Sequence, residues 1–271
     1  MGRFLGQTVI VTGASAGIGA ALCRRFAAEG ADVALLARRK DALDSVASDV
    51  RALGRQAFPF ECDVTRDGDV ERAVEAVRNA AGRIDVVVAN AGIGITGAFA
   101  KLELDDFRRQ FETNVFGVLR TIRATLGDVE RSRGRIAIIG SVASHVVAPG
   151  TINYSMSKAA VAALAQGLEL ELAPKGVGVT LILPGFVESE IRLIDNKGHL
   201  RENGKDPIPQ FLVMPTDEAA AQMVDGIWRR KPECIVTMHG KLGVFLGRHT
   251  PRLVASVVRA AQRVSPVKFD K

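Results

Sequence analysis

Tyr154 and Lys158 lie four residues apart in a stretch with helical periodicity, so both side chains are expected on one face of a helix. Tyr154 is the only tyrosine in the chain. A lysine ammonium close to a phenol stabilises the phenolate and lowers its pKa from about 10 towards neutral pH. A tyrosine with such a pKa can act as a general acid or base. The pair alone is a weak signal, and we interpret it together with the motifs around it.

A glycine-rich loop is the second feature that could take part in the chemistry of a site. Thr12-Gly13-Ala14-Ser15-Ala16-Gly17-Ile18-Gly19 follows the first predicted strand and precedes a predicted helix. Glycines let the backbone approach a pyrophosphate, whose charge is bound by the free N–H groups of the helix N-terminus. The loop therefore predicts a dinucleotide site. Ser141, directly after the predicted strand 135–140, is expected at the same edge of the sheet.

Arg38 directly follows the second predicted strand, about twenty residues after Gly19, where an acid would bind the ribose hydroxyl of NAD. The sequence here is Ala37-Arg38-Arg39-Lys40. Arginine can bind a 2′-phosphate in a bidentate manner. Cations at a helix N-terminus also oppose the helix dipole, which favours a phosphate ligand over a merely solvated cluster. We predict NADP(H), with Arg38 and Arg39 at the phosphate.

Apolar runs that are typical of buried parallel strands alternate with helical stretches. This alternation predicts an α/β fold with a doubly wound parallel sheet of about seven strands and helices on both faces. The predicted strands are 8–11, 32–37, 56–62, 85–89, 135–140, 178–183 and 234–238. The predicted helices are 18–29, 40–53, 67–81, 104–126, 154–173 and 216–230, the last with Thr216 as its N-cap.

We expect one domain over residues 1–240, followed by a basic C-terminal extension over 241–271. The extension holds seven basic residues and one acid, so it carries the whole net charge of +6. From Pro251 onward its pattern predicts a basic amphipathic helix. Such a helix can lie on an anionic membrane surface. It can equally dock on the sheet edge or on another subunit with its arginines facing water, and both interpretations stay open.

Composition excludes several classes of protein. The chain has 271 residues, of which 47% are hydrophobic and 24% charged, as in globular proteins. Its three cysteines are far apart, which argues against a disulfide framework and against a metal site. The basic segment is confined to one end and only one Trp and one Tyr are present, so we expect no nucleic-acid partner. No signal peptide precedes the first predicted strand, so we expect a cytoplasmic protein, with membrane association at the periphery as the alternative.

Together these features resemble the compact form of the short-chain dehydrogenase/reductase family, and the likeness extends from Thr8 to Ser189. Seven motifs of that family occur here in its order. They are TGASAGIG at 12–19, Cys62-Asp63-Val64, Asn90-Ala91-Gly92, Asn114, Ser141, Tyr154 with Lys158, and Pro184-Gly185 with Val187. Two positions depart from the family pattern. Ala16 stands where many NADP-dependent members carry a basic residue, and Ser189 where threonine is common.

The resemblance implies a Rossmann-type domain and a reversible hydride transfer between NADP(H) and a small hydrophobic carbonyl or alcohol. Tyr154 would give a proton to the carbonyl oxygen, and Ser141 would hydrogen-bond that oxygen. Lys158 would bind the nicotinamide ribose and lower the pKa of Tyr154. Asn114 would hold a water in a proton relay. Members of the family commonly form homodimers or homotetramers through the helices that hold Asn114 and Tyr154.

The resemblance also assigns residues to the cofactor, most of them in loops that follow strands. They are Gly13, Ser15, Gly17, Ile18, Gly19, Arg38, Arg39, Asp63, Val64, Asn90, Ala91, Gly92, Tyr154, Lys158, Pro184, Gly185, Val187 and Ser189.

The substrate is expected to contact residues 94–98, 145–149 and the segment 186–215, which resembles a mobile lid. His145 could contact the substrate, although an ordinary loop histidine is the simpler interpretation. Two alternatives remain for the function. A non-catalytic NADP(H)-sensing protein would be expected to lose the Ser141, Tyr154 and Lys158 set. A nucleotide-sugar epimerase would need a larger C-terminal domain than 271 residues allow.

Overall fold

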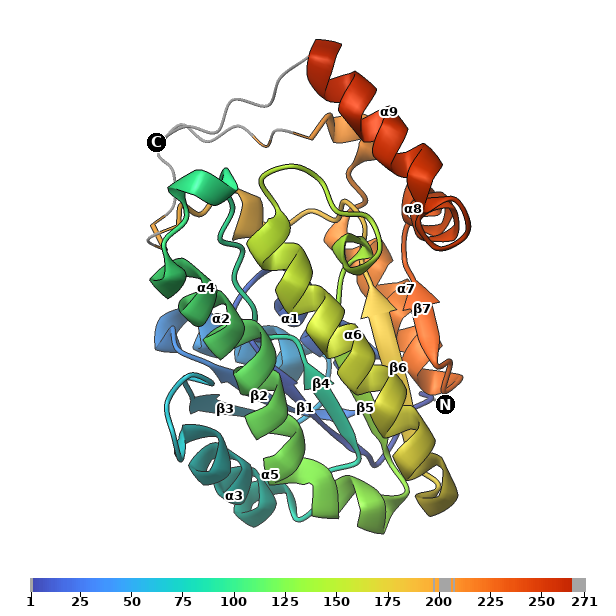
Figure 1. The fold of residues 1–271 in the computed structure, drawn as a ribbon. Coiled ribbons are helices and arrows are strands. Elements are labelled where there is room, and N and C mark those ends of the chain that lie inside the picture. Colours follow the sequence, from blue (N-terminus) through green and yellow to red (C-terminus); the bar gives the residue numbers. More distant parts are fainter. Residues whose placement is uncertain (1, 197, 200–205, 207, 265–271) are drawn as a thin grey trace.

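All seven strands of the computed structural model run parallel in one sheet (Figure 1). Their order is β3-β2-β1-β4-β5-β6-β7, so the winding direction reverses between β1 and β4. This confirms the predicted doubly wound α/β fold. The strands are β1 Thr8–Thr12, β2 Asp32–Ala37, β3 Ala57–Glu61, β4 Val86–Ala89, β5 Arg135–Ile139, β6 Gly178–Leu183 and β7 Glu233–Ile235.

The structure describes residues 2–196, 198, 199, 206 and 208–264. Parts of two predicted segments lie outside these residues. They are 197, 200–205 and 207 of the expected lid, and 265–271 of the basic extension.

Helices cover both faces of the sheet because both faces are apolar. Val9 and Val11 of β1 pack into one core with α1 Gly17–Ala28, α2 Lys40–Ala52 and α7 Thr216–Trp228. Ile10, between them, packs into the other core with α3 Asp69–Ala81, α5 Gly117–Ser132 and α6 Ile152–Leu172. Successive residues of a strand point to opposite faces, which produces this division. Both cores confirm the expected layers of helices.

The prediction of one regular helix over 104–126 is wrong in its middle. Helix α4 spans Leu104–Phe111, a π-helical turn spans Glu112–Phe116, and α5 follows. The Asn114 side chain inside the turn accepts a hydrogen bond from Ile93 N–H (2.8 Å) and donates to Ile93 O (3.0 Å). Single π turns are frequent at functional sites. The amphipathic pattern continues on both sides of this one, so the sequence pattern could not reveal it.

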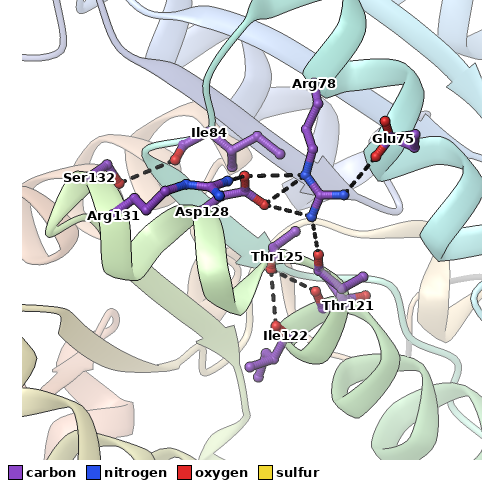
Figure 2. A network of polar contacts seen from close by, with 10 residues as sticks. Glu75, Arg78, Ile84, Thr121, Ile122, Thr125, Asp128, Arg131 and Ser132 are labelled. Carbon is purple, nitrogen blue, oxygen red and sulfur yellow. Dashed lines mark hydrogen bonds and ion pairs between the residues drawn. The ribbon is translucent and has the colours of Figure 1, made fainter.

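A partly buried ion pair joins α5 to α3, as Figure 2 shows. Asp128 of α5 is 4% exposed and accepts from Arg78 of α3 at 2.8 Å, and Arg131 pairs with the same carboxylate. Arg78 also donates to Ala124 O at 2.7 Å. Two guanidinium groups offset the cost of burying this carboxylate. The contact holds in place the helix that begins directly after the Asn114 turn.

The C-terminal part differs from the predictions in its boundaries. Thr216 is the first residue of α7 and not its N-cap, and its Oγ1 donates to Glu188 O (3.0 Å). Strand β7 ends at Ile235, short of the predicted 238, because Thr237 caps a helix by accepting from Gly240 N–H (3.1 Å).

Up to residue 264, the C-terminal part of the chain forms two helices, at the top of Figure 1 and beyond the carboxyl ends of the strands. Helix α8 spans Met238–His249 and α9 spans Pro251–Val264, so the helix predicted from Pro251 is confirmed. The expected boundary at residue 240 falls inside α8. Among the described residues, no helix combines the length and the apolar character that a bilayer crossing needs.

Candidate active site

A cavity of about 650 Å³ opens at the carboxyl ends of the central strands. Its volume is in the range of small-molecule and cofactor sites. Among the described residues, Asn114 is the one predicted site residue that does not line this cavity. The predicted residues that line it are Gly13, Ser15, Gly17, Ile18, Gly19, Arg38, Arg39, Asp63, Val64, Asn90, Ala91, Gly92, Ser141, Tyr154, Lys158, Pro184, Gly185, Val187 and Ser189.

The glycine loop has the geometry that a phosphate group needs. Gly13 and Gly17 adopt left-handed backbone conformations (φ +65° and +51°), and a Cβ on Gly13 would lie 2.9 Å from Ala91 Cα. Ala16, the N-cap of α1, contributes no side-chain hydrogen bond, and the first turn of α1 holds no acid. Backbone N–H groups at this end therefore remain available for an anion. These features fit the pyrophosphate of a nicotinamide dinucleotide.

Hydrogen bonds between strand ends fix this loop. Thr12 Oγ1 accepts from the N–H groups of Asn90 and Ala91, both at 3.1 Å. The Asn90 amide donates to Thr12 O at 2.9 Å. The glycine loop after β1 and the Asn90-Ala91-Gly92 segment after β4 are thus one rigid unit, placed at the point where the winding of the sheet reverses.

Arg38 and Arg39, directly after β2, form a cationic rim of the cavity. Arg38 lines the cavity and forms no ion pair with the part of the chain that the structure describes. Arg39 Nη2 lies 3.6 Å from the Glu190 carboxylate. Burial raises the pKa of Asp63, but hydrogen bonds from Thr65 and the charges of Arg38 and Arg66 outweigh it and hold the pKa below its ordinary value. An ionised Asp63 thus lies within the field of Arg38.

Lys158 is a buried cation. It belongs to α6 and is only 5% exposed. Its Nζ donates a hydrogen bond to Ile139 O at the end of β5 (2.8 Å). Burial lowers the pKa of Lys158 to about 8. The ammonium therefore remains charged at neutral pH, close to its titration range. Its Nζ lies 5.7 Å from the centre of the Tyr154 ring.

Tyr154 does not show the lowered pKa that the sequence predicted. Burial raises the pKa of its phenol, and a hydrogen bond with Ser141 and the charge of Arg192 lower it only in part. The prediction considered the charge of Lys158 and not the loss of water around the phenol. Tyr154 is consequently a protonated phenol at neutral pH.

Ser141 and Asn114 hold the loops around this pair. Ser141 Oγ accepts from Ala143 N–H (3.1 Å), which caps a short 3₁₀ turn after β5. Asn114 is fully buried, and besides its two bonds to Ile93 it donates to Ser157 Oγ at 3.1 Å. Both hydrogens of its amide are therefore used by the protein. Its side chain ties the loop after β4 to α6, which carries Tyr154 and Lys158.

Several polar residues in the cavity were not found from the sequence. Arg192 donates to Val187 O (3.0 Å) and pairs with Asp206 (2.6 Å). Asn196 exchanges hydrogen bonds with the backbone of Thr96, and Arg109 of α4 donates to Asn196 O. The segment 186–196 thereby closes against the loop after β4. No sequence motif marks these residues, because their chemistry depends on which loops meet over the sheet.

One of the three expected substrate segments lies elsewhere. Residues 145–149 do not belong to the described lining of the cavity. His145 Nε2 instead lies 3.0 Å from Arg248 Nη2 of α8, so the simpler interpretation of this histidine holds. The two other segments do reach the cavity, through Gly94 and Ile95 and through residues of the segment 187–198.

Comparison with known proteins agrees with this geometry. A family model described as short chain dehydrogenase matches residues 7–198. The chain belongs to the short-chain dehydrogenase/reductase family. Members of this family are oxidoreductases that use nicotinamide cofactors, and solved structures similar to this chain hold NADP or NAD⁺.

Three similar proteins illustrate the range of that family. The 11-beta-hydroxysteroid dehydrogenase A of Arachis hypogaea is 39% identical over 188 residues, which are 69% of this chain and 54% of that protein. A short chain dehydrogenase from Burkholderia cenocepacia J2315 in complex with NADP is 30% identical with a TM-score of 0.78, over 88% of this chain and 99% of that chain. An NAD⁺-bound xylitol dehydrogenase is 27% identical with a TM-score of 0.75, over 86% and 98%.

The chain spans about half the length of its Arachis relative, and 17% of the length of another curated relative.

The buried charge of Lys158 makes stability depend on pH in a definite direction. Its folded pKa, about 8, lies below the ordinary lysine value of 10.5, so between these pH values the unfolded chain binds more protons than the folded chain. The free energy of unfolding should therefore rise with pH across this interval. Relative to Lys158→Met, the wild type should gain up to about 1.4 kcal/mol per pH unit. Urea denaturation at pH 7 to 10 measures this, and parallel pH profiles for the two proteins would contradict it.

Proposed function

We propose that the protein is an NADP(H)-dependent oxidoreductase that interconverts a small hydrophobic carbonyl compound and its alcohol. The observation that carries the proposal is the convergence of Ser141, Tyr154 and Lys158 on the same cavity as the glycine loop. The nicotinamide ring, when bound, supplies or accepts the hydride. The protein's own residues would supply the proton, the orientation and the charge.

In the reductive direction Tyr154 would donate its proton to the carbonyl oxygen while the carbonyl carbon accepts the hydride. The raised pKa of Tyr154 keeps this proton in place at neutral pH. Ser141, which lines the same cavity as Tyr154, would donate a hydrogen bond to the same oxygen. The phenolate left behind would be stabilised by the Lys158 ammonium, which is charged below about pH 8.

The family resemblance implies a bound water at Asn114. That water would have to bind a group other than the two N–H bonds of the Asn114 side-chain amide. Both of these are bonded to Ile93 O and Ser157 Oγ. We infer that the side chain of Asn114 acts mainly by positioning the loop after β4 against α6.

The substrate end of the cavity supports an apolar carbonyl compound. Ile95, Ile191 and Ile194 line it, together with the polar residues Arg109 and Asn196. An apolar body with one polar group away from the reacting carbonyl would fit this lining.

Replacing Tyr154 with phenylalanine tests the proposed chemistry. Oxidation of NADPH should be screened over hydrophobic ketones, β-ketoacyl thioesters and steroid-like carbonyls. With any substrate found, Tyr154→Phe should lower kcat at least about 100-fold, because the general acid is lost. NADPH binding, followed by its fluorescence, should stay within about twofold of wild type, since the phenyl ring is kept. A variant with nearly wild-type kcat would contradict the role of Tyr154. Binding without turnover of any carbonyl would favour a cofactor-sensing protein.

Preference for NADP(H) over NAD(H) is supported by the cationic rim. Arg38 lines the cavity free of any ion pair among the described residues, whereas Arg39 lies near Glu190. No acid ends β2, where the NAD ribose would need one. Arg38 is therefore the main candidate to bind a 2′-phosphate.

Arg38→Ala should separate the two cofactors. Loss of a charge-assisted phosphate contact should raise the Kd of NADPH about 10- to 100-fold. The Kd of NADH, which lacks the phosphate, should change by less than about threefold. Arg24→Ala is the matched control, because Arg24 on α1 pairs with Asp49 and does not belong to the described cavity lining. Equal weakening of both cofactors would contradict the assignment.

Homo-oligomerisation is supported by exposed apolar side chains on the π turn and α6. Phe116 is 49% exposed, Met156 47% and Leu170 70%. These elements hold Asn114 and Tyr154, so association here would also brace the site. A monomer at all concentrations in light scattering would contradict this.

The C-terminal extension is proposed to contact an anionic membrane surface, a source of lipophilic substrate. Leu242 and Phe245 of α8 and Leu253 and Val257 of α9 are all more than half exposed. No acid occurs between residues 241 and 264. Apolar side chains flanked by cations match the chemistry of an anionic bilayer surface.

Vesicle co-sedimentation tests this contact in the full-length protein. The wild type should pellet with anionic phosphatidylserine vesicles and less with neutral phosphatidylcholine vesicles. The double variant Phe245→Glu/Val257→Glu should lose most of that binding. If wild type and double variant pellet equally, the surface does not bind membranes. A drop in oligomer size in the variant would instead assign it to subunit contact.

A further inference from the structure

We propose that helix α8 is part of the active-site framework, and that His239 in its first turn is a positioning residue for the Pro184–Phe186 segment and the base of the lid. This inference rests on the proposed function, because it assigns Pro184 and Gly185 to the nicotinamide end of the cavity.

The imidazole of His239 binds the backbone of this segment directly. Its Nε2 accepts a hydrogen bond from Phe186 N–H at 3.1 Å, and Thr237 Oγ1 lies 3.1 Å from the same nitrogen. The ring stacks on Phe186, with centroids 5.1 Å apart and planes 25° from parallel. A neutral imidazole with its proton on Nδ1 leaves the single lone pair of Nε2 to accept the hydrogen bond from Phe186 N–H.

Gly185 allows α8 to approach this closely. A Cβ on Gly185 would lie 2.1 Å from Thr237 Oγ1 and 2.7 Å from His239 Nε2. Gly185 itself lines the cavity. The first turn of α8 therefore packs on the outer side of a backbone segment whose inner side faces the proposed nicotinamide position.

The same helix also contacts the loop that carries Ser141. A Cβ on Gly240 would lie 3.0 Å from Val142 Cγ2. Val142 N–H in turn donates to Pro184 O (3.0 Å). Farther along α8, a Cβ on Gly247 would lie 2.7 Å from His145 O, and Arg248 Nη2 lies 3.0 Å from His145 Nε2. Helix α8 thus spans the two loops that follow β5 and β6.

His239 contacts the backbone at the point where the two ends of the lid pair with each other. Phe186 O accepts from Met214 N–H at 2.9 Å, and Glu188 N–H donates to Met214 O at 3.0 Å. Fixing Phe186 therefore fixes the paired strand-like ends of the lid. The phosphate cradle after β1 and Arg38 after β2 lie on the other side of the switch point. Loss of His239 should consequently affect the nicotinamide half of the site and spare the adenosine half.

The test compares His239→Ala with the conservative His239→Gln, whose Oε1 can accept from Phe186 N–H. His249→Ala is the matched control, a histidine on the exposed end of the same helix. Hydrogen exchange of the full-length protein reports the contact without any ligand. Exchange in residues 184–188 and 213–216 should be faster in His239→Ala, restored in His239→Gln, and unchanged in His249→Ala. Exchange in residues 12–19 should stay at the wild-type rate in all three.

Ligand binding supplies the second readout. His239→Ala should raise the Kd of NADPH and lower kcat, reducing kcat/KM about tenfold, the effect of one lost hydrogen bond. The Kd of 2′,5′-ADP, which has no nicotinamide half, should stay within about twofold of wild type. Wild-type exchange rates in His239→Ala, or equal loss of both ligands, would overturn the positioning role. If wild type binds no NADPH, the proposed function fails, while the exchange data still decide the role of His239.

Discussion

A buried positive charge is the constraint on which the rest of the site depends. The Lys158 ammonium is almost fully removed from water and has the Ile139 carbonyl at 2.8 Å as its hydrogen-bond acceptor. Burying an ammonium costs several kcal/mol, and the lowered pKa is the sign of that cost. The Ile139 carbonyl at the end of β5 offsets part of that cost. Gly92 of the loop after β4 lies next to the ammonium, since a Cβ there would be 3.7 Å from Nζ.

The loops around this charge are each fixed by a side chain that bonds to backbone of a distant segment. Thr12 binds the loop after β4, Asn114 binds the same loop from the π turn, and His239 binds the loop after β6. The loops after β4 and β6 are thus held by side chains from other elements. Such preorganisation lets a site keep polar groups in place without reorganisation during a reaction. The positions of the polar groups in the site therefore depend on the contacts between these loops at the carboxyl edge of the sheet.

The sequence predicted what depends on local pattern. Buried strands appear as apolar runs, the glycine loop follows from its spacing, and Tyr154 and Lys158 share a helix face by the four-residue spacing alone. The π turn at Asn114 was missed because its hydrogen-bond partner, Ile93, is distant in the sequence. His239 was missed for the same reason, since its partner Phe186 is 53 residues away. The pKa of Tyr154 was predicted in the wrong direction, because burial is set by tertiary packing and outweighs one nearby charge.

A crystal structure of the protein with bound NADP⁺ tests the central claim most directly. The account predicts the nicotinamide ring between Pro184–Gly185 and Tyr154, the Lys158 ammonium in contact with the nucleotide, and the 2′-phosphate at Arg38. A nicotinamide ring outside the cavity, or a Tyr154 hydroxyl turned away from it, would contradict the account.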